Sequence, residues 1–478
     1  MTLRIYDTRA RALRDFVPLE PGRVGIYVCG PTVQSPAHVG HLRSAIAFDI
    51  LRRWLLESGF DVTLVRNVTD IDDKVLVNAE AQGRAWWELA TANTRAFNDV
   101  YDAVGVLPPS MEPRATGHVP DMVVIISELI ARGHAYATGD GNVWFDVRSW
   151  PSYGELSGQR PDAMQGETAE AASGKRDPLD FALWKARRPG EPESASWDTP
   201  WGRGRPGWHI ECSGMAKRYL GPVFDIHGGG LDLQFPHHEN ELAQSTAAGD
   251  EFARYWMHHG LLNAGAEKMS KSLGNFQLAT EALAEVRPVV LRYAMAAPHY
   301  RSVSQWTDEV LAEAATAYAR IETFVRNASA AVAAAEPAEQ PAEQPADEAS
   351  TTWAVFAAAM DDDLGVPAGL ALIHGAVRAG NTLLEADGSR AELAAVLSVV
   401  RRMLSVLGLD PDQWPSADDG GRLTGVVDEL VQVALTARSE ARARKDFTAA
   451  DSIRDRLVAA GIVVEDTAAG ARWRLAGD

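Results

Sequence analysis

Hydrophobic and polar positions along the first part of the chain follow the patterns of two strands with a helix between them. The run Val24–Cys29 (VGIYVC) is apolar and rich in β-forming residues, and Gly30-Pro31 ends it. From His41 to Glu57, apolar residues recur at helical spacing, and Asp61–Val68 returns to a strand pattern. This order predicts a βαβ unit of a parallel sheet, whose ligands bind at the carboxyl ends of the strands.

The next segment has the pattern of an insertion into that sheet. Between residues 113 and 205 we expect a helix at Pro120–Arg132 and a strand at Val143–Val147. The strand pattern then resumes at His209–Cys212 and Phe224–Ile226. One α/β catalytic domain, formed by residues 1–112 and 206–305 and interrupted by residues 113–205, explains this order better than three consecutive domains.

After Trp306 the apolar positions follow helical stripes, which predicts a helical domain over residues 306–415. The Ala-, Pro- and Glu-rich stretch Asn327–Ser350, with its PAEQPAEQ repeat, cannot bury a core, so we expect a disordered acidic linker there. A long helical stretch over Gly425–Ala460 and a hairpin-like tail around Gly470 predict a small α/β domain over residues 416–478.

Composition narrows the class of protein. The chain has 478 residues, of which 46% are hydrophobic and 23% charged, as in ordinary soluble multi-domain proteins. Its N-terminus lacks a secretory apolar segment and no apolar run is long enough to cross a bilayer, so we expect a cytoplasmic protein without a membrane partner. The net charge of −19 argues against a broad nucleic-acid-coating surface but allows a local basic face.

Two short motifs carry candidate chemistry. Pro31–His41 (PTVQSPAHVGH) leads from a strand into a helix, where backbone N–H groups and the imidazoles of His38 and His41 can bind phosphate, and Gly40 permits close approach. In EKMSKSLGN, Lys268 and Lys271 can neutralise the charge of a leaving pyrophosphate. Either motif alone is more often an ordinary turn or a solvated loop, but both in this order are the strongest signal in the sequence.

These motifs resemble the HIGH and KMSKS motifs of class I aminoacyl-tRNA synthetases. The stretches YVCGPTV, RNVTDIDDK, MEPRATGH, FALWK, WGRGRPGWHIECS and FDIHGGGLDLQFPHHENE narrow the resemblance to the cysteinyl-tRNA synthetase family, in particular its actinobacterial members. The resemblance implies a Rossmann-type catalytic domain with a connective insertion, a helical bundle and an anticodon-binding domain. It also implies a monomer that activates L-cysteine with ATP and Mg²⁺ and transfers it to the 3′ end of tRNA(Cys).

A metal site can be considered from the residues themselves. His237 and Glu241 are four residues apart and would share one face of a helix, while Cys29 and Cys212 would each end a strand at the same sheet edge. Two isolated cysteines are more often small buried hydrophobes. The resemblance, however, places all four residues on the family's zinc positions. Zinc would distinguish a cysteine thiolate from the serine hydroxyl, which pockets without a metal separate poorly.

The resemblance also implies roles for other residues, each with an ordinary structural alternative. In the ATP site it adds Gly230 and Asp232 to His38, Gly40, His41 and Lys271, where the alternative is a tight turn. Thr69 and Trp208 would line the cysteine pocket, although one could simply end a strand and the other could be core. The anticodon residues would be Arg442, Phe447, Asp451 and Asp466, with Trp473 beside them.

Some features depart from the family pattern, and two other functions compete. Gln34-Ser35 stands where many members have Tyr-Asp, Val39 replaces isoleucine, and the loop over residues 191–199 is longer than usual. A related ligase that passes cysteine to an amino sugar would share the catalytic half but typically lacks the C-terminal tail. A non-catalytic tRNA- or zinc-binding paralogue would not need the intact motif histidines and lysines.

Overall fold

The computed structural model describes residues 2–163, 174–264, 267–268, 276–334, 346–386, 388–415, 417–467 and 470–475. The chain forms two compact units, Met1–Asp410 and Pro411–Asp478. None of the described helices is long and apolar enough to span a membrane.

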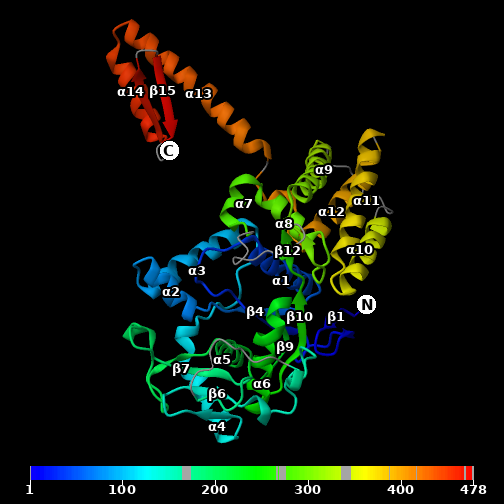
Figure 1. Ribbon diagram of the computed structural model, residues 1–478. Helices are drawn as coiled ribbons and strands as arrows, with labels where there is room; N and C mark the ends of the chain where they lie inside the picture. The colour runs from blue at the N-terminus through cyan, green and yellow to red at the C-terminus, as the bar shows by residue number, and fades with distance from the viewer. Residues whose placement is uncertain are drawn as a thin grey trace. The chain divides into compact units, whose positions relative to one another are not determined.

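The centre of the first unit is a four-stranded parallel sheet of order β10-β9-β3-β4 (Figure 1). Its strands are β3 (Arg23–Val28), β4 (Asp61–Arg66), β9 (Val223–Gly230) and β10 (Phe252–His259). Helix α1 (Val39–Glu57) connects β3 to β4, which confirms the predicted βαβ unit. Val28 lies opposite both Arg66 and Gly228, so the carboxyl ends of three strands meet at one edge.

The prediction of a strand at His209–Cys212 is wrong, because these residues lie in helix α5 (Trp208–Leu220). Every residue from His209 to Ala216 is buried. A helix that is covered on all sides shows no apolar stripe. These four residues therefore lack the helical period that would distinguish a helix from a strand in the sequence. Cys212 therefore approaches the sheet edge from a helix.

Between β4 and α5, the described residues form three α-helices and a second sheet. Helices α2 (Asp73–Ala81) and α3 (Trp86–Ala103) come first, followed by α4 (Val119–Ala131). The antiparallel sheet has the order β5-β6-β7-β8, formed by Ala135–Ala137, Val143–Phe145, Phe181–Ala186 and Gly204–Pro206. Its Phe145 and Trp184 share one buried core with Cys29 and Cys212, so the insertion packs as part of the same body.

The remainder of the first unit is mainly helical. It contains α6 (Glu239–Ala247), α7 (Ala279–Glu285), α8 (Pro288–Ala296), α9 (Asp308–Ala333), α10 (Ala346–Asp361), α11 (Val366–Glu385) and α12 (Arg390–Leu407). The N-terminal hairpin pairs β1 (Arg4–Asp7) with β2 (Ala12–Asp15), and a small sheet joins β11 (Leu262–Ala264) to β12 (Glu267–Lys268) and β13 (Ser304–Gln305).

The region expected to be a linker, residues 327–350, is helical at both of its ends. Helix α9 continues to Ala333 and α10 begins at Ala346, and residues 335–345 lie outside the described part of the chain. The alanine content that we read as linker composition is also favourable for helix, and here it extends both helices.

In the second unit, the long helical stretch expected over Gly425–Ala460 is divided into α13 (Ala417–Ala443) and α14 (Phe447–Ala459). Lys445 between them has a φ of 60°, and the Asp446 side chain caps α14 by accepting from the Ala449 N–H. Strands β14 (Ile462–Thr467) and β15 (Gly470–Leu475) form the antiparallel hairpin predicted for the tail.

Candidate functional site

A cavity of about 360 Å³ opens at the carboxyl edge of the parallel sheet. It is lined by the end of β3, the start of α1 and the end of β9, as expected for a parallel α/β sheet. Among the predicted site residues it brings together Cys29, His38, Gly40, His41, Trp208, Gly230 and Asp232.

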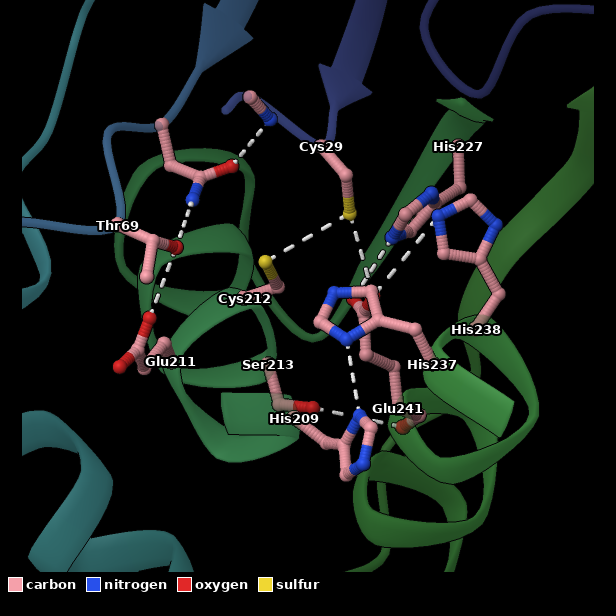
Figure 2. Close-up of polar contacts among 12 residues, drawn as sticks. Cys29, Thr69, His209, Glu211, Cys212, Ser213, His227, His237, His238 and Glu241 are labelled. Atoms are coloured by element: carbon pink, nitrogen blue, oxygen red, sulfur yellow. Dashed lines mark hydrogen bonds and ion pairs between the residues drawn. The ribbon is translucent and has the colours of Figure 1, made fainter. Parts of the chain in front are cut away.

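Next to this cavity, two thiols, an imidazole and a carboxylate converge in the interior (Figure 2). Cys29 Sγ lies 3.6 Å from Cys212 Sγ and 3.2 Å from Glu241 Oε1, and His237 Nε2 lies 3.0 Å from the same oxygen. One possible ligand atom from each residue lies within 4.8 Å of the others, and all four residues are buried. Sulfur, imidazole and carboxylate donors in a group of four suit a tetrahedral zinc ion.

Short segments position these four side chains. Cys29 directly follows β3, Cys212 lies on α5, and Glu241 lies in the first turn of α6. His237 belongs to the irregular turn Gln234–His238 that leads into α6, where the spacing of four residues brings it to Glu241 as expected.

The neighbouring imidazoles favour the charged form of the carboxylate in this cluster. Burial raises the pKa of Glu241, but His227 and His237 lower it by a larger amount. The pKa of Glu241 therefore lies well below its ordinary value. Burial lowers the pKa of His237, yet Glu241 and Cys212 raise it to about 10. Without a metal the carboxylate thus holds a proton on the neighbouring imidazole. A bound metal cation can supply the same positive charge and release that proton.

Residues outside the predicted set orient the cluster, and sequence reasoning missed them. His227 on β9 donates from Nε2 to Glu241 Oε2 over 2.8 Å, and both side chains are fully buried. His209 Nδ1 lies 2.9 Å from His237 Nδ1, which turns His237 Nε2 toward the cluster. Partners of this kind fix ligand orientation. The available signal was spacing, since His209 and Cys212 are three residues apart on one helix.

His238, which is not one of the four predicted ligands, also lies close to them. Cys29, His227, His238 and Glu241 form a second group whose ligand atoms could hold an ion, and this group shares Cys29 and Glu241 with the first. His238 Nδ1 lies 2.8 Å from His258 Nε2, and its Nε2 lies 4.0 Å from Glu241 Oε1. Glu239 belongs to neither group and accepts from the N–H groups of Gly154 and Ser157.

The two motif histidines begin helix α1. His38 is the N-cap, and its Nδ1 accepts from the Gly40 N–H over 3.2 Å, while the His38 N–H donates to His41 Nδ1 over 3.1 Å. The two ring centroids are 3.8 Å apart. Both imidazoles therefore lie at the positive end of a helix and line the cavity, which is where phosphate would be stabilised.

The predicted adenosine residues lie at the end of β9. Gly230 is the last residue of β9, and the single helical turn Leu231–Leu233 follows it. At this position, where the alternative was a tight turn, the chain passes from a strand end into that helical turn. A Cβ at Gly230 would lie 2.5 Å from Asp232 Oδ1, so a larger residue would displace the Asp232 side chain.

The two predicted cysteine-pocket residues differ in position. Trp208 lines the cavity, and its ring centroid lies 4.2 Å from that of His237. Thr69 is buried, with its hydroxyl donating to Glu211 Oε2 over 2.9 Å (Figure 2). Burial, followed by the charge of Cys212, raises the pKa of Glu211 well above its ordinary value. Glu211 is therefore a buried acid beside the thiols that sequence reasoning did not single out.

The remaining predicted residues lie elsewhere. Lys268 ends β12, where it pairs with Asn263 of β11, and Lys271 lies outside the described residues. In the second unit, Phe447 begins α14 and is 61% exposed, and Asp451 lies on the same helix. Arg442 is in the last turn of α13, and Asp466 is in β14 opposite Ala471. Trp473 Nε1 donates to Asp428 Oδ1 over 2.8 Å.

Comparison with known proteins first shows the class of protein to which the chain belongs. The sequence model of the tRNA synthetases class I (C) catalytic domain matches residues 15–316, that of the DALR domain residues 355–409, and that of the cysteinyl-tRNA ligase anticodon binding domain residues 425–474. Methionyl-tRNA synthetase of Mycobacterium tuberculosis, solved with methionyl-adenylate, has a similar fold with a TM-score of 0.57 and 17% identity over 81% of this chain and 90% of that one. A leucyl enzyme of Agrobacterium radiobacter, LeuRS, solved with tRNA and LeuAMS, has a TM-score of 0.59 and 12% identity over 85% and 88%. The fold is that of a class I tRNA synthetase.

Relatives along the whole length then give the family. The cysteine–tRNA ligase of Streptomyces griseus is 56% identical over 478 residues, which cover 99% of each chain. That of Beutenbergia cavernae is 56% identical over 100% of each chain, and that of Frankia casuarinae is 52% identical over 100% of each. The chain belongs to the cysteine–tRNA ligase family, which confirms the resemblance read from its motifs.

Proposed function

We propose that this protein activates L-cysteine with ATP, forming cysteinyl-adenylate and pyrophosphate, and then transfers the cysteinyl group to the 3′ end of tRNA(Cys). The observation that carries this proposal is the buried group of Cys29, Cys212, His237 and Glu241 at the wall of a cavity that also contains His38 and His41. A thiol-binding centre and a phosphate-binding helix start at one site are what selection and activation of cysteine require.

In this proposal one Zn²⁺ is held by Cys29, Cys212, His237 and Glu241. Two thiols make this set softer than the overlapping one with His227 and His238, so it fits zinc better. The ion, when bound, would favour a substrate thiolate over an alcohol. His209 and His227 would orient His237 and Glu241, and burial would exclude water from the centre.

The nucleotide residues have separate tasks. His38 and His41, at the start of α1, would bind the phosphates of Mg²⁺-ATP, with Gly40 leaving room for them. Gly230 would let the adenosine approach the end of β9, and Asp232 would accept from a ribose hydroxyl. Lys268 and Lys271 would neutralise charge on the leaving pyrophosphate.

Thr69 and Trp208 would contribute to the cysteine pocket in different ways. Trp208 would pack against the bound amino acid, because its ring lines the cavity beside His237. Thr69 would act through Glu211, whose carboxyl group accepts its hydrogen bond next to the thiols.

The other assignments concern the whole chain. Residues 1–112 and 206–305 would form the catalytic domain, 113–205 the connective insertion, 306–415 the helical domain and 416–478 the anticodon-binding domain. Within the last, Arg442, Phe447, Asp451 and Asp466 would contact the anticodon, where the exposed Phe447 ring offers a stacking surface. We propose a cytoplasmic monomer.

The test combines pyrophosphate exchange with two acceptors. Zinc-loaded protein should catalyse cysteine-dependent ATP–pyrophosphate exchange and charge tRNA(Cys), while serine should be worse by more than about 100-fold. Transfer to a glucosaminyl-inositol in place of tRNA would identify the amino-sugar ligase instead, and absence of exchange would identify a binding protein.

Two neighbouring glutamates provide a matched pair of variants. Glu241→Gln removes a proposed ligand and should abolish stoichiometric zinc and cysteine activation. Glu239→Gln changes an equally buried acid of the same helix turn that belongs to neither group of possible ligands, and it should retain both. Equal zinc content in the two variants would contradict the proposed ligand set.

A further inference from the structure

Lys74 is a cation at the cavity to which the sequence motifs assign no role. It lies in the first turn of α2, lines the cavity and is exposed. Its backbone N–H donates to Asp72 Oδ1 over 2.9 Å. Within the residues that the structure describes, the Lys74 ammonium group makes no hydrogen bond or ion pair, so it is available to a ligand.

The helix that carries Lys74 is fixed to two other parts of the site. Its neighbour Asp73 accepts from Lys185 Nζ over 2.6 Å and also pairs with Arg205, both from the inserted sheet. Farther along α2, Asn78 Nδ2 donates to the backbone oxygen of Gln34 over 2.9 Å, which ties the helix to the segment that precedes the motif histidines. The helix of Lys74 is therefore connected both to the inserted sheet and to the segment that precedes α1.

The two carboxylates next to Lys74 in the sequence are paired with other groups. Burial raises the pKa of Asp73, but Lys185 and Arg205 lower it to about 2, so this carboxylate stays charged and paired to those two cations. Asp72 caps the helix through the Lys74 backbone. The ammonium group is then left for an anion that enters from solvent at the cavity mouth.

We propose that Lys74 binds a phosphodiester of the 3′-terminal strand of the tRNA during transfer; this inference rests on the proposed function. The start of α1 with His38 and His41 already offers donors for the phosphates of ATP. Lys74 comes from another helix and is an exposed residue of the cavity wall, so the second substrate can reach it after the adenylate has formed. A tRNA end is the polyanion that this reaction brings there.

The experiment separates the two steps of the reaction. Pyrophosphate exchange and single-turnover transfer from preformed cysteinyl-adenylate to tRNA are measured for Lys74→Met, for Lys74→Arg and for the control Lys217→Met. Lys217 pairs with Glu128 and Asp250, does not line the cavity, and loses the same charge when replaced. We expect Lys74→Met to keep exchange within about twofold and to lose about tenfold in transfer at subsaturating tRNA.

Salt dependence provides a readout that misfolding would not change in this way. The slope of log(kcat/KM) for tRNA against log salt should become shallower by about 0.7 in Lys74→Met, as for one lost contact to a single strand. Lys74→Arg and Lys217→Met should keep the wild-type slope.

Two results would overturn the inference. One is transfer by Lys74→Met at the wild-type rate with an unchanged salt slope. The other is a raised KM for ATP with normal transfer from preformed adenylate, which would assign Lys74 to the nucleotide. If the wild-type protein charged no tRNA at all, the proposed function itself would fail together with this inference, so the two failures can be distinguished.

Discussion

Replacing His227 by phenylalanine tests how the proposed zinc site is oriented. His227 Nε2 donates to Glu241 Oε2 over 2.8 Å, and its ring stacks on Trp256 with centroids 4.4 Å apart and an angle of 17°. Phenylalanine keeps a flat apolar ring against Trp256 but removes the donor. The variant therefore isolates the hydrogen bond to the proposed ligand from the packing around it.

The size of the effect follows from burial. Both side chains are fully buried, so water cannot replace the lost donor at Glu241 Oε2. A hydrogen bond to a charged group contributes about 1.5–3 kcal/mol, and loss of an outer partner of a metal ligand weakens metal binding by about 10–100-fold. These ranges agree, since tenfold corresponds to about 1.4 kcal/mol. We expect His227→Phe to bind zinc about 10–100-fold more weakly than wild type.

Competition with a chromophoric zinc chelator measures this affinity, and circular dichroism checks that the variant is folded. His134→Phe is the control: it removes an imidazole that hydrogen-bonds Ser149 in the inserted segment and belongs to neither group of possible ligands. Wild-type zinc affinity in folded His227→Phe would refute the idea that His227 holds Glu241 in place for the metal.

Three further predictions concern stability and tRNA. Burial raises the pKa of Asp73, but its two cationic partners lower it to about 2. The stability that charged Asp73 gives the folded protein is therefore present above about pH 4 and is lost as the pH falls toward 2. In urea unfolding, Asp73→Asn should lower the free energy of unfolding by about 1 kcal/mol at pH 7 and change it little at pH 2. Arg292→Met should destabilise the first unit by about 3–5 kcal/mol in the same assay, because Asp49 would lose a buried partner, and a loss below 1 kcal/mol would contradict this. Phe447→Ala should lower tRNA charging about tenfold while exchange is unchanged, and equal loss of both activities would exclude anticodon stacking.

Much of the fold could be predicted because local patterns dominate where one face of an element is buried. Helix α1 has a clear helical period, and β3 is a continuous apolar run of β-forming residues. The C-terminal hairpin lies in the tail where the sequence predicts it. Helix α5 could not be recognised, because burial on all sides removes its period. The break between α13 and α14 depends on Lys445 adopting a positive φ, which a single lysine does not signal.

The site was predictable for residues that carry a motif and unpredictable for their partners. Cys29, Cys212, His237 and Glu241 were named from the sequence, and the structure brings their ligand atoms together. The contact of His227 with Glu241 joins a strand to a helix, and no sequence spacing encodes such a contact. The same holds for Lys74, because only the folded cavity distinguishes it from an ordinary surface lysine.

The central claim is that a metal held by Cys29, Cys212, His237 and Glu241 selects cysteine. The most direct measurement is the ratio of exchange rates with cysteine and with serine, taken before zinc is removed by a chelator, after its removal, and after zinc is added back. We predict that removal abolishes cysteine-dependent exchange and that zinc restores both the rate and the preference over serine. Full activity with unchanged preference in protein shown by elemental analysis to contain no metal would contradict the account.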